Sequence, residues 1–266
     1  MTGPPERDPA AYPRPTARQS LRRGAGLAAL VVALAWAWSG TVESENLGRA
    51  LPRLLDFMGR LIPPDVSVAP SVIRAALETL QIALLGTAIS AAVSLPLGLA
   101  AAVNLSPAWL HLPIKWLLVI LRGIPILLLA VMFVSAVGLG PFPGVLAVAA
   151  HSTGMLGKFY AEAFENARSG VLEALDSTGA TWLQVVRFGV LPQVAPDLGR
   201  DTLFRFELNL RETVVLGLVG AGGIGLLVRL YIRSFQYTKV GTVTIVILVM
   251  VVAVEQASVA LRKQLR

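Results

Sequence analysis

The sequence contains no cysteine, and only 15% of its 266 residues are charged. Without cysteine the chain has no disulfide scaffold, no thiolate metal site and no cysteine nucleophile. A soluble domain of this length usually carries charge on about a quarter of its residues. Here the deficit comes with long runs that lack any charged residue. These runs indicate membrane-spanning segments rather than a large soluble core.

The charges that remain are mostly basic, with 23 Lys and Arg against 16 Asp and Glu and a formal net charge of +7. In a soluble protein such an excess would indicate nucleic acid binding, whereas in a membrane protein basic residues mark cytoplasmic loops. The mean hydropathy is +0.68 and 55% of the residues are hydrophobic. We therefore expect an all-α, polytopic membrane helical bundle with lipid as its surroundings and no nucleic acid partner.

Charged and proline-rich stretches divide the chain into about six predicted transmembrane helices. Residues 1–23 contain five arginines and are predicted to form a cytoplasmic disordered tail, followed by a first transmembrane helix over 24–42. A signal peptide is the alternative for that helix, because Ala35-Trp36-Ala37 resembles a cleavage site. Residues 43–71 are predicted to form a periplasmic loop, and residues 72–262 form the transmembrane core.

Within the core, the longest polar stretch is 163–203, which we expect to be a cytoplasmic loop. Pro125 is predicted to kink the helix that contains it, because proline cannot donate a backbone hydrogen bond. The five core spans are predicted at 74–102, 114–137, 143–162, 204–230 and 239–261.

Six spans place both termini on the same side of the membrane. On the side of the termini and of residues 163–203 lie 16 Lys and Arg residues, against 7 on the other side. The positive-inside rule therefore predicts that both termini are cytoplasmic.

Two glycine-containing motifs resemble nucleotide sites. Residues 220–225 fit G-x-G-x-x-G, but a dinucleotide site needs an acid about 20 residues further on, and the first acid after the glycines is Glu255. Residues 154–158 resemble a phosphate loop, but Ser152 and Phe159 stand where glycine and a hydroxyl residue belong. We therefore expect no cofactor, and any ATP to be bound by a partner subunit. A nucleotide-dependent membrane enzyme and a structural subunit without transport stay open as alternatives.

The start of the predicted fifth span is unusually polar for a membrane segment. Glu207 and Arg211 are four residues apart and are predicted to pair, and Arg205, Asn209 and Glu212 share a neighbouring face. Because charge inside a membrane is costly, these side chains are candidates to line a path for an anion. For Arg205 the alternative is an interfacial position with its charge reaching out to the headgroups.

Further candidate pathway residues lie outside this polar face. Arg122 is interpreted either as a pathway cation or as an interface anchor, and His151 as a packing residue. Four glycines would let a neighbouring backbone approach or let the helix unwind around a pathway: Gly220, Gly222, Gly223 and Gly225. No catalytic residue and no metal ligand is expected.

The polar stretch 163–203 is predicted to contain two short helices. The first contains E-A-L-D-S-T and stops at Gly179, the second covers 180–188, and Pro192 follows as a break. Such a pair either fits a groove on a partner or merely connects two spans.

This stretch resembles the EAA motif of ABC-importer permeases, although Leu175 replaces the second alanine and Gly189 replaces an isoleucine. The matching residues are Glu173, Ala174, Gly179, Leu191 and Pro192. The resemblance implies a type I ABC importer permease fold, in which the 173–192 loop couples the permease to a separate ATPase.

A narrower resemblance, to phosphonate-type importer permeases, covers most of the chain after residue 50. It rests on five segments: 78–87 (ETLQIALLGT), 122–125 (RGIP), 151–158 (HSTGMLGK), 205–207 (RFE) and 217–225 (GLVGAGGIG). The resemblance implies a homodimer in the bacterial cytoplasmic (inner) membrane with cytoplasmic ABC ATPase subunits. It also implies a periplasmic substrate-binding protein that delivers phosphonate or a related phosphorus oxyanion. Phosphate, phosphite, an amino acid or a metal oxyanion is the alternative solute, and Glu212 departs from the small residue usual in this family.

Overall fold

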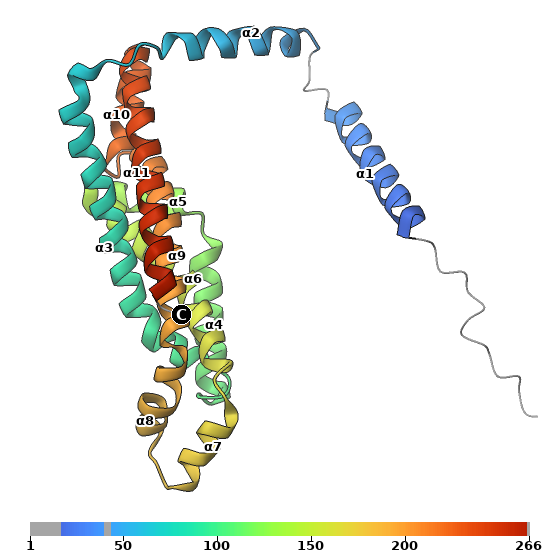
Figure 1. The fold of residues 1–266 in the computed structure, drawn as a ribbon, viewed down its shortest axis with the longest axis vertical. Coiled ribbons are helices and arrows are strands. Elements are labelled where there is room, and N and C mark those ends of the chain that lie inside the picture. The colour runs from blue at the N-terminus through green and yellow to red at the C-terminus, as the bar shows by residue number, and fades with distance from the viewer. Residues whose placement is uncertain (1–16, 40–43, 265–266) are drawn as a thin grey trace, which may run out of the picture. The chain divides into compact units, whose positions relative to one another are not determined.

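The computed structural model describes residues 17–39 and 44–264, and every regular element in them is helical (Figure 1). The chain divides into two units, residues 1–59 and 60–266. The first unit begins with α1 (Ala17–Ser39), whose central residues 24–36 are apolar. The predicted disordered tail is therefore helical over residues 17–23, and its first 16 residues lie outside the described part of the chain.

The segment predicted as a periplasmic loop is mostly helical, because it contains α2 (Ser44–Arg60). Arg53, Asp56 and Arg60 share one face of this helix, while leucines such as Leu51 and Leu55 occupy another. A short 3-10 turn, η2 (Val66–Val68), lies near the start of the second unit and leads into its first long helix. The carboxylate of Asp65 caps this turn by accepting from the hydroxyl and backbone N–H of Ser67, which lowers the pKa of Asp65.

The second unit is a bundle around α3 (Ala69–Ala101) and α6 (Pro141–Glu165), which share its largest helix contact. Small residues bring these two helices close together. A Cβ atom on Gly86 would lie 2.5 Å from Val148 Cγ1, and one on Gly98 would lie 2.8 Å from Tyr160 Cβ. Since lipid offers no hydrophobic drive for association, this close backbone approach is what packs the helices.

The remaining long helices pack against one or both members of this pair (Figure 1). They are α4 (Ala108–Gly123), α5 (Ile126–Val137), α9 (Leu191–Gly217), α10 (Ile224–Arg233) and α11 (Tyr237–Gln264). The chain bends by 85° between α4 and α5, at Ile124 and Pro125. The predicted kink at Pro125 is confirmed, because proline ends the hydrogen-bonded ladder of α4.

By length and composition, the described residues contain two helices that could cross a membrane, Val66–Ala101 and Tyr237–Gln264, and α4 with α5 would make a third. The all-α helical bundle is confirmed, while the number of six spans stays a prediction. The central helices α6 and α9 carry charged residues such as Lys158, which pairs with Glu162 of its own helix, and Arg205, which donates to Ser152 of α6.

The predicted fifth span over 204–230 is wrong at both ends. The chain passes from α8 (Trp182–Gln184) through a π-helical turn, η3 (Val185–Val190), directly into α9. Pro192 therefore starts a helix rather than breaking one, because a first-turn residue needs no intrahelical N–H bond. At the other end, α9 stops at Gly217 and α10 starts at Ile224.

Glycine conformation ends α9, since Gly220, Gly222 and Gly223 have φ angles of 95°, 82° and 75°. Only glycine adopts such angles without strain. A Cβ atom on Gly223 would also lie 2.5 Å from Thr79 Oγ1. The glycine run is thus a helix break, the second of the two roles that its sequence suggested.

We expect Gly223→Ala to lower the free energy of unfolding by at least about 1 kcal/mol, because alanine would be strained at this φ and would clash with Thr79. Gly170→Ala is the matched control, since a Cβ atom there meets nothing within 4 Å and its φ is ordinary. The melting temperatures of both variants are measured by thermal unfolding of the purified proteins in detergent. Equal melting temperatures for the two variants would contradict the strained turn.

Candidate functional site

A buried cluster of polar side chains joins α6 and α9 at Arg205, which is only 1% exposed. Its Nε donates to Ser152 Oγ at 3.0 Å, and its Nη2 donates to Glu212 Oε2 at 2.8 Å. The proposed interfacial position for Arg205 is wrong, because the guanidinium is enclosed by the protein and paired with a carboxylate.

Asn209 extends this cluster to α3. Its Nδ2 donates to Thr87 Oγ1 at 2.8 Å, and its Oδ1 accepts from Ser152 Oγ at 2.8 Å. The Thr87 hydroxyl donates in turn to the carbonyl of Ala83 at 2.6 Å. Among the described residues no buried side-chain nitrogen or oxygen lacks a partner. We call Thr87, Ser152, Arg205, Asn209 and Glu212 the polar cluster. Because its buried groups are fully hydrogen-bonded, the cluster fixes the register of three helices with little loss of free energy from unsatisfied polar atoms.

The predicted pair between Glu207 and Arg211 is wrong. Glu207 is buried and forms an ion pair with Arg262 of α11, while Arg211 pairs with Glu255 of the same helix at 3.1 Å. Ion pairs between helices replace the predicted pair within α9, because α11 offers a side chain of opposite charge to both Glu207 and Arg211. Both pairs hold α11 against α9.

Removing the Arg205 side chain should destabilise the protein strongly. Arg205→Leu leaves the partly buried Glu212 carboxylate uncompensated, at a cost of about 3–5 kcal/mol, and Glu212→Gln in the same chain should recover part of that cost. Arg211→Leu is the control, because its pair is 47% and 48% exposed and such pairs contribute about 0–1 kcal/mol.

Thermal unfolding of the three variants in detergent checks this ranking. Arg205→Leu and Arg211→Leu proteins of equal stability would contradict the claim that the polar cluster stabilises the bundle.

Three of the four predicted pathway glycines lie in the break between α9 and α10, and Gly225 is the second residue of α10; all four lie away from the polar cluster. Glu78 Oε1 accepts from the Gly223 N–H at 3.0 Å, and Thr79 Oγ1 accepts from the Ile224 N–H at 2.8 Å. These contacts on α3 cap the start of α10. They lie about two helical turns, roughly 12 Å, from Thr87 on the same helix. Gly220, Gly222, Gly223 and Gly225 are buried there.

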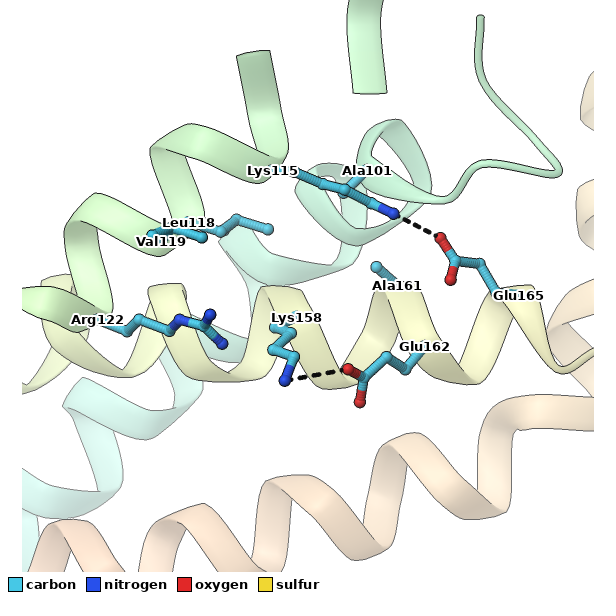
Figure 2. A pocket seen from close by; sticks show the side chains of 9 residues that line it. All are labelled: Ala101, Lys115, Leu118, Val119, Arg122, Lys158, Ala161, Glu162 and Glu165. Carbon is cyan, nitrogen blue, oxygen red and sulfur yellow. Dashed lines mark hydrogen bonds and ion pairs between the residues drawn. The ribbon is translucent and has the colours of Figure 1, made fainter. Parts of the chain in front are cut away.

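Arg122 lies apart from the polar cluster as well. It ends α4 and lines a cavity of about 210 Å³ between α4 and α6, together with Lys115, Lys158, Glu162 and Glu165 (Figure 2). Burial raises the pKa of Glu165, but the Val103 N–H and the Lys115 ammonium outweigh it and hold the pKa below its usual value. Glu165 therefore stays ionised at neutral pH.

The EAA-like residues lie on α7 (Ser169–Ser177), in the turn that follows it and at the start of α9, at one end of the bundle (Figure 1). Glu173 and Ala174 are exposed on α7. Gly179 has φ of 76° and donates its N–H to the carbonyl of Asp176 at 3.0 Å, which closes α7 and reverses the chain. The predicted helix stop at Gly179 is confirmed.

Several contacts attach this helix pair to the bundle. Trp182 Nε1 donates to the carbonyl of Leu105 in the α3–α4 turn at 2.9 Å, and the Arg168 N–H donates to Gln193 Oε1 at 3.1 Å. Gly189 is buried under α7, where a Cβ atom would lie 2.7 Å from Leu175 Cδ1. The two departures from the EAA pattern therefore compensate each other: a larger residue at 175 packs over a smaller one at 189.

Sequence reasoning missed the roles of Thr79, Thr87 and Ser152. Each is a hydroxyl residue in an apolar run, which is a weak signal because such residues also bond to their own helix. Leu191 and Pro192 were expected to follow a helix and instead begin α9.

Comparison with known proteins places the chain in a family. The model for the inner membrane component of binding-protein-dependent transport systems matches residues 94–265. The chain belongs to this family. Its members are permease components of importers that work with an ATPase and a substrate-binding protein. The chain is accordingly a multi-pass transport subunit of the bacterial inner membrane rather than an enzyme.

Two curated relatives show how far the similarity extends. The chain is 41% identical to the phosphite transport system permease protein PtxC of Stutzerimonas stutzeri, over 89% of this chain and 86% of that protein. It is 39% identical to the phosphate-import permease protein PhnE of Mycolicibacterium smegmatis, over 77% of this chain and 39% of that protein.

Solved structures support the fold. A chain of the inward-facing MetNI methionine ABC transporter matches with a TM-score of 0.67 at 20% identity, covering 76% of this chain and 99% of that one. At this identity the likeness concerns the fold alone. The expected type I importer permease fold is confirmed.

Proposed function

We propose that this chain forms the translocation pathway for a phosphorus oxyanion of the phosphite, phosphonate or phosphate class. The observation that carries the proposal is 41% identity to a phosphite permease along 89% of the chain. The partly exposed charges of Arg211 and Glu212 on α9 support it, because charged residues inside a membrane segment mark ion pathways.

The path follows α9 on the side that the bundle leaves open. Glu212 and Arg211 keep 30% and 47% of their side chains exposed, although both are engaged in ion pairs. Within the polar cluster Glu212 keeps an exposed part while the other four members are buried, and a second copy packed on that side would complete the path as a homodimer. Both termini and the α7–α8 end would face the cytoplasm, in keeping with the excess of Lys and Arg on that side.

Uptake by cells tests the substrate class. Cells that contain the ATPase and the binding protein, with and without this chain, are given labelled phosphite or alkylphosphonate. We expect uptake only with this chain, and stronger competition from phosphite, phosphonates or phosphate than from methionine or molybdate. Competition by methionine or a metal oxyanion alone would reject the phosphorus oxyanion and keep the importer.

The α7–α8 segment is our proposed contact with the ATPase. It projects from the bundle (Figure 1), and Glu173 on α7 and the apolar side chains of Leu183 on α8 and Phe188 on η3 are all exposed. The hydrogen bonds of Trp182 and Gln193 connect this segment to the α3–α4 turn and to α9, so a displacement of α7 and α8 would move the helices that line the path. ATP-driven closure of the ATPase would in this way rock the permease between two states.

Gly179→Val should abolish uptake while leaving the protein in the membrane, because a β-branched residue is strained at a φ of 76°. A Cβ atom at this position meets nothing within 4 Å, so the variant disturbs the turn and not the packing. Gly179→Asn should keep most of the uptake, since asparagine tolerates this conformation. ATP hydrolysis and uptake by the reconstituted complex are measured together.

Gly170→Val is the control, at the start of the helix that the Gly179 turn follows, where φ is ordinary and space is equally open. Wild-type uptake by Gly179→Val would remove the α7–α8 turn from the mechanism.

A further inference from the structure

The cavity between α4 and α6 is lined by a charged half and an apolar half. Its charged residues are Lys115, Arg122, Lys158, Glu162 and Glu165, and its apolar residues are Ala101, Leu118, Val119 and Ala161. Figure 2 shows Lys115 and Arg122 on α4 facing Lys158 and the two glutamates on α6. We call it the α4–α6 pocket. It shares no residue with the polar cluster.

Two ion pairs in the pocket leave one of its three cationic side chains without a counter-ion among the described residues. Lys115 pairs with Glu165 at 3.0 Å, and Lys158 pairs with Glu162 at 3.2 Å. Arg122 is half-buried and makes no hydrogen bond or ion pair with any residue that the structure describes. A partly desolvated guanidinium without a counter-ion is costly, so the geometry favours an anion bound beside it.

The shape of the pocket indicates the kind of anion. The guanidinium of Arg122 shares the pocket with two ammonium groups, and it matches a tetrahedral phosphate group, which accepts bidentate hydrogen bonds from arginine. The apolar half of the pocket adjoins the outer surface of α4, where Leu112, Trp116 and Ile120 are exposed. A free oxyanion would make no contact with this apolar lining, whereas the glycerol and acyl chains of a lipid would cover it.

We propose that the α4–α6 pocket binds the phosphate group of an anionic phospholipid at Arg122, with the acyl chains along α4. Basic pockets between membrane helices on the cytoplasmic side suit such headgroups. The proposal takes from the proposed function only the orientation of the α7–α8 end toward the cytoplasm. Lipid binding is measured on purified protein without transport, so its failure and a failure of uptake are separate results.

Binding of phosphatidylglycerol and of phosphatidylcholine to the purified full-length protein in detergent tests the proposal, by native mass spectrometry over a lipid titration. We expect the protein to prefer phosphatidylglycerol, and Arg122→Gln to weaken that lipid about tenfold, the loss expected for one charged hydrogen-bonding group. Arg74→Gln removes the same charge from an exposed site at the start of α3 and should leave binding unchanged.

Glu162→Gln distinguishes ligand binding from a folding defect. It releases Lys158 from its ion pair, so it should tighten phosphatidylglycerol binding, which a disrupted fold would not do. Equal binding of the two lipids, or no change with Arg122→Gln and Glu162→Gln, would overturn the proposal. Inorganic phosphate or phosphite that binds in an Arg122-dependent way and displaces the lipid would assign the pocket to the free oxyanion and reject the lipid.

Discussion

The burial of the Arg205 guanidinium within a membrane bundle is the constraint on which the rest of this structure depends. A charge at this depth is tolerated only where protein groups replace water. Ser152 from α6 and Glu212 from α9 contact it directly, and Asn209 relays the hydrogen bonds to Thr87 on α3. Sliding any one of these helices by a turn would leave polar atoms without partners. The cluster therefore specifies how the central helices pack, a task that apolar contacts alone perform poorly in lipid.

Glycines with positive φ angles form a turn at each end of the bundle, and the two turns differ in their surroundings. At one end, α9 stops in a glycine turn that Glu78 and Thr79 of α3 clamp through hydrogen bonds. At the other end, Gly179 reverses the chain between two short helices whose surface stays open. The first turn is enclosed and braces the bundle, while the second leaves open the surface that we propose for the ATPase. The same conformational freedom thus serves packing in one place and, in our proposal, docking in the other.

Most of the fold followed from the sequence, because long charge-free runs and proline positions reflect local physics. The kink at Pro125, the stop at Gly179 and the final helix needed no knowledge of tertiary contacts. The pairing of Glu207 and Arg211 could not be predicted in this way, since their partners on α11 lie 44 or more residues away. The helix start at Pro192 was equally hidden, because a proline in the first turn and a proline after a helix look alike in sequence. The site residues Thr87 and Ser152 acquire meaning only when α3, α6 and α9 meet.

Hydrogen–deuterium exchange of the permease alone and in complex with its ATPase tests the central claim, a fixed polar centre with a docking segment at one end. The account predicts that residues 169–184 gain protection when the ATPase binds, while the amides around Ser152 and Asn209 are strongly protected in both samples. Unchanged exchange over 169–184, with new protection elsewhere, would contradict the docking surface. Rapid exchange around Ser152 in either sample would contradict the fixed centre.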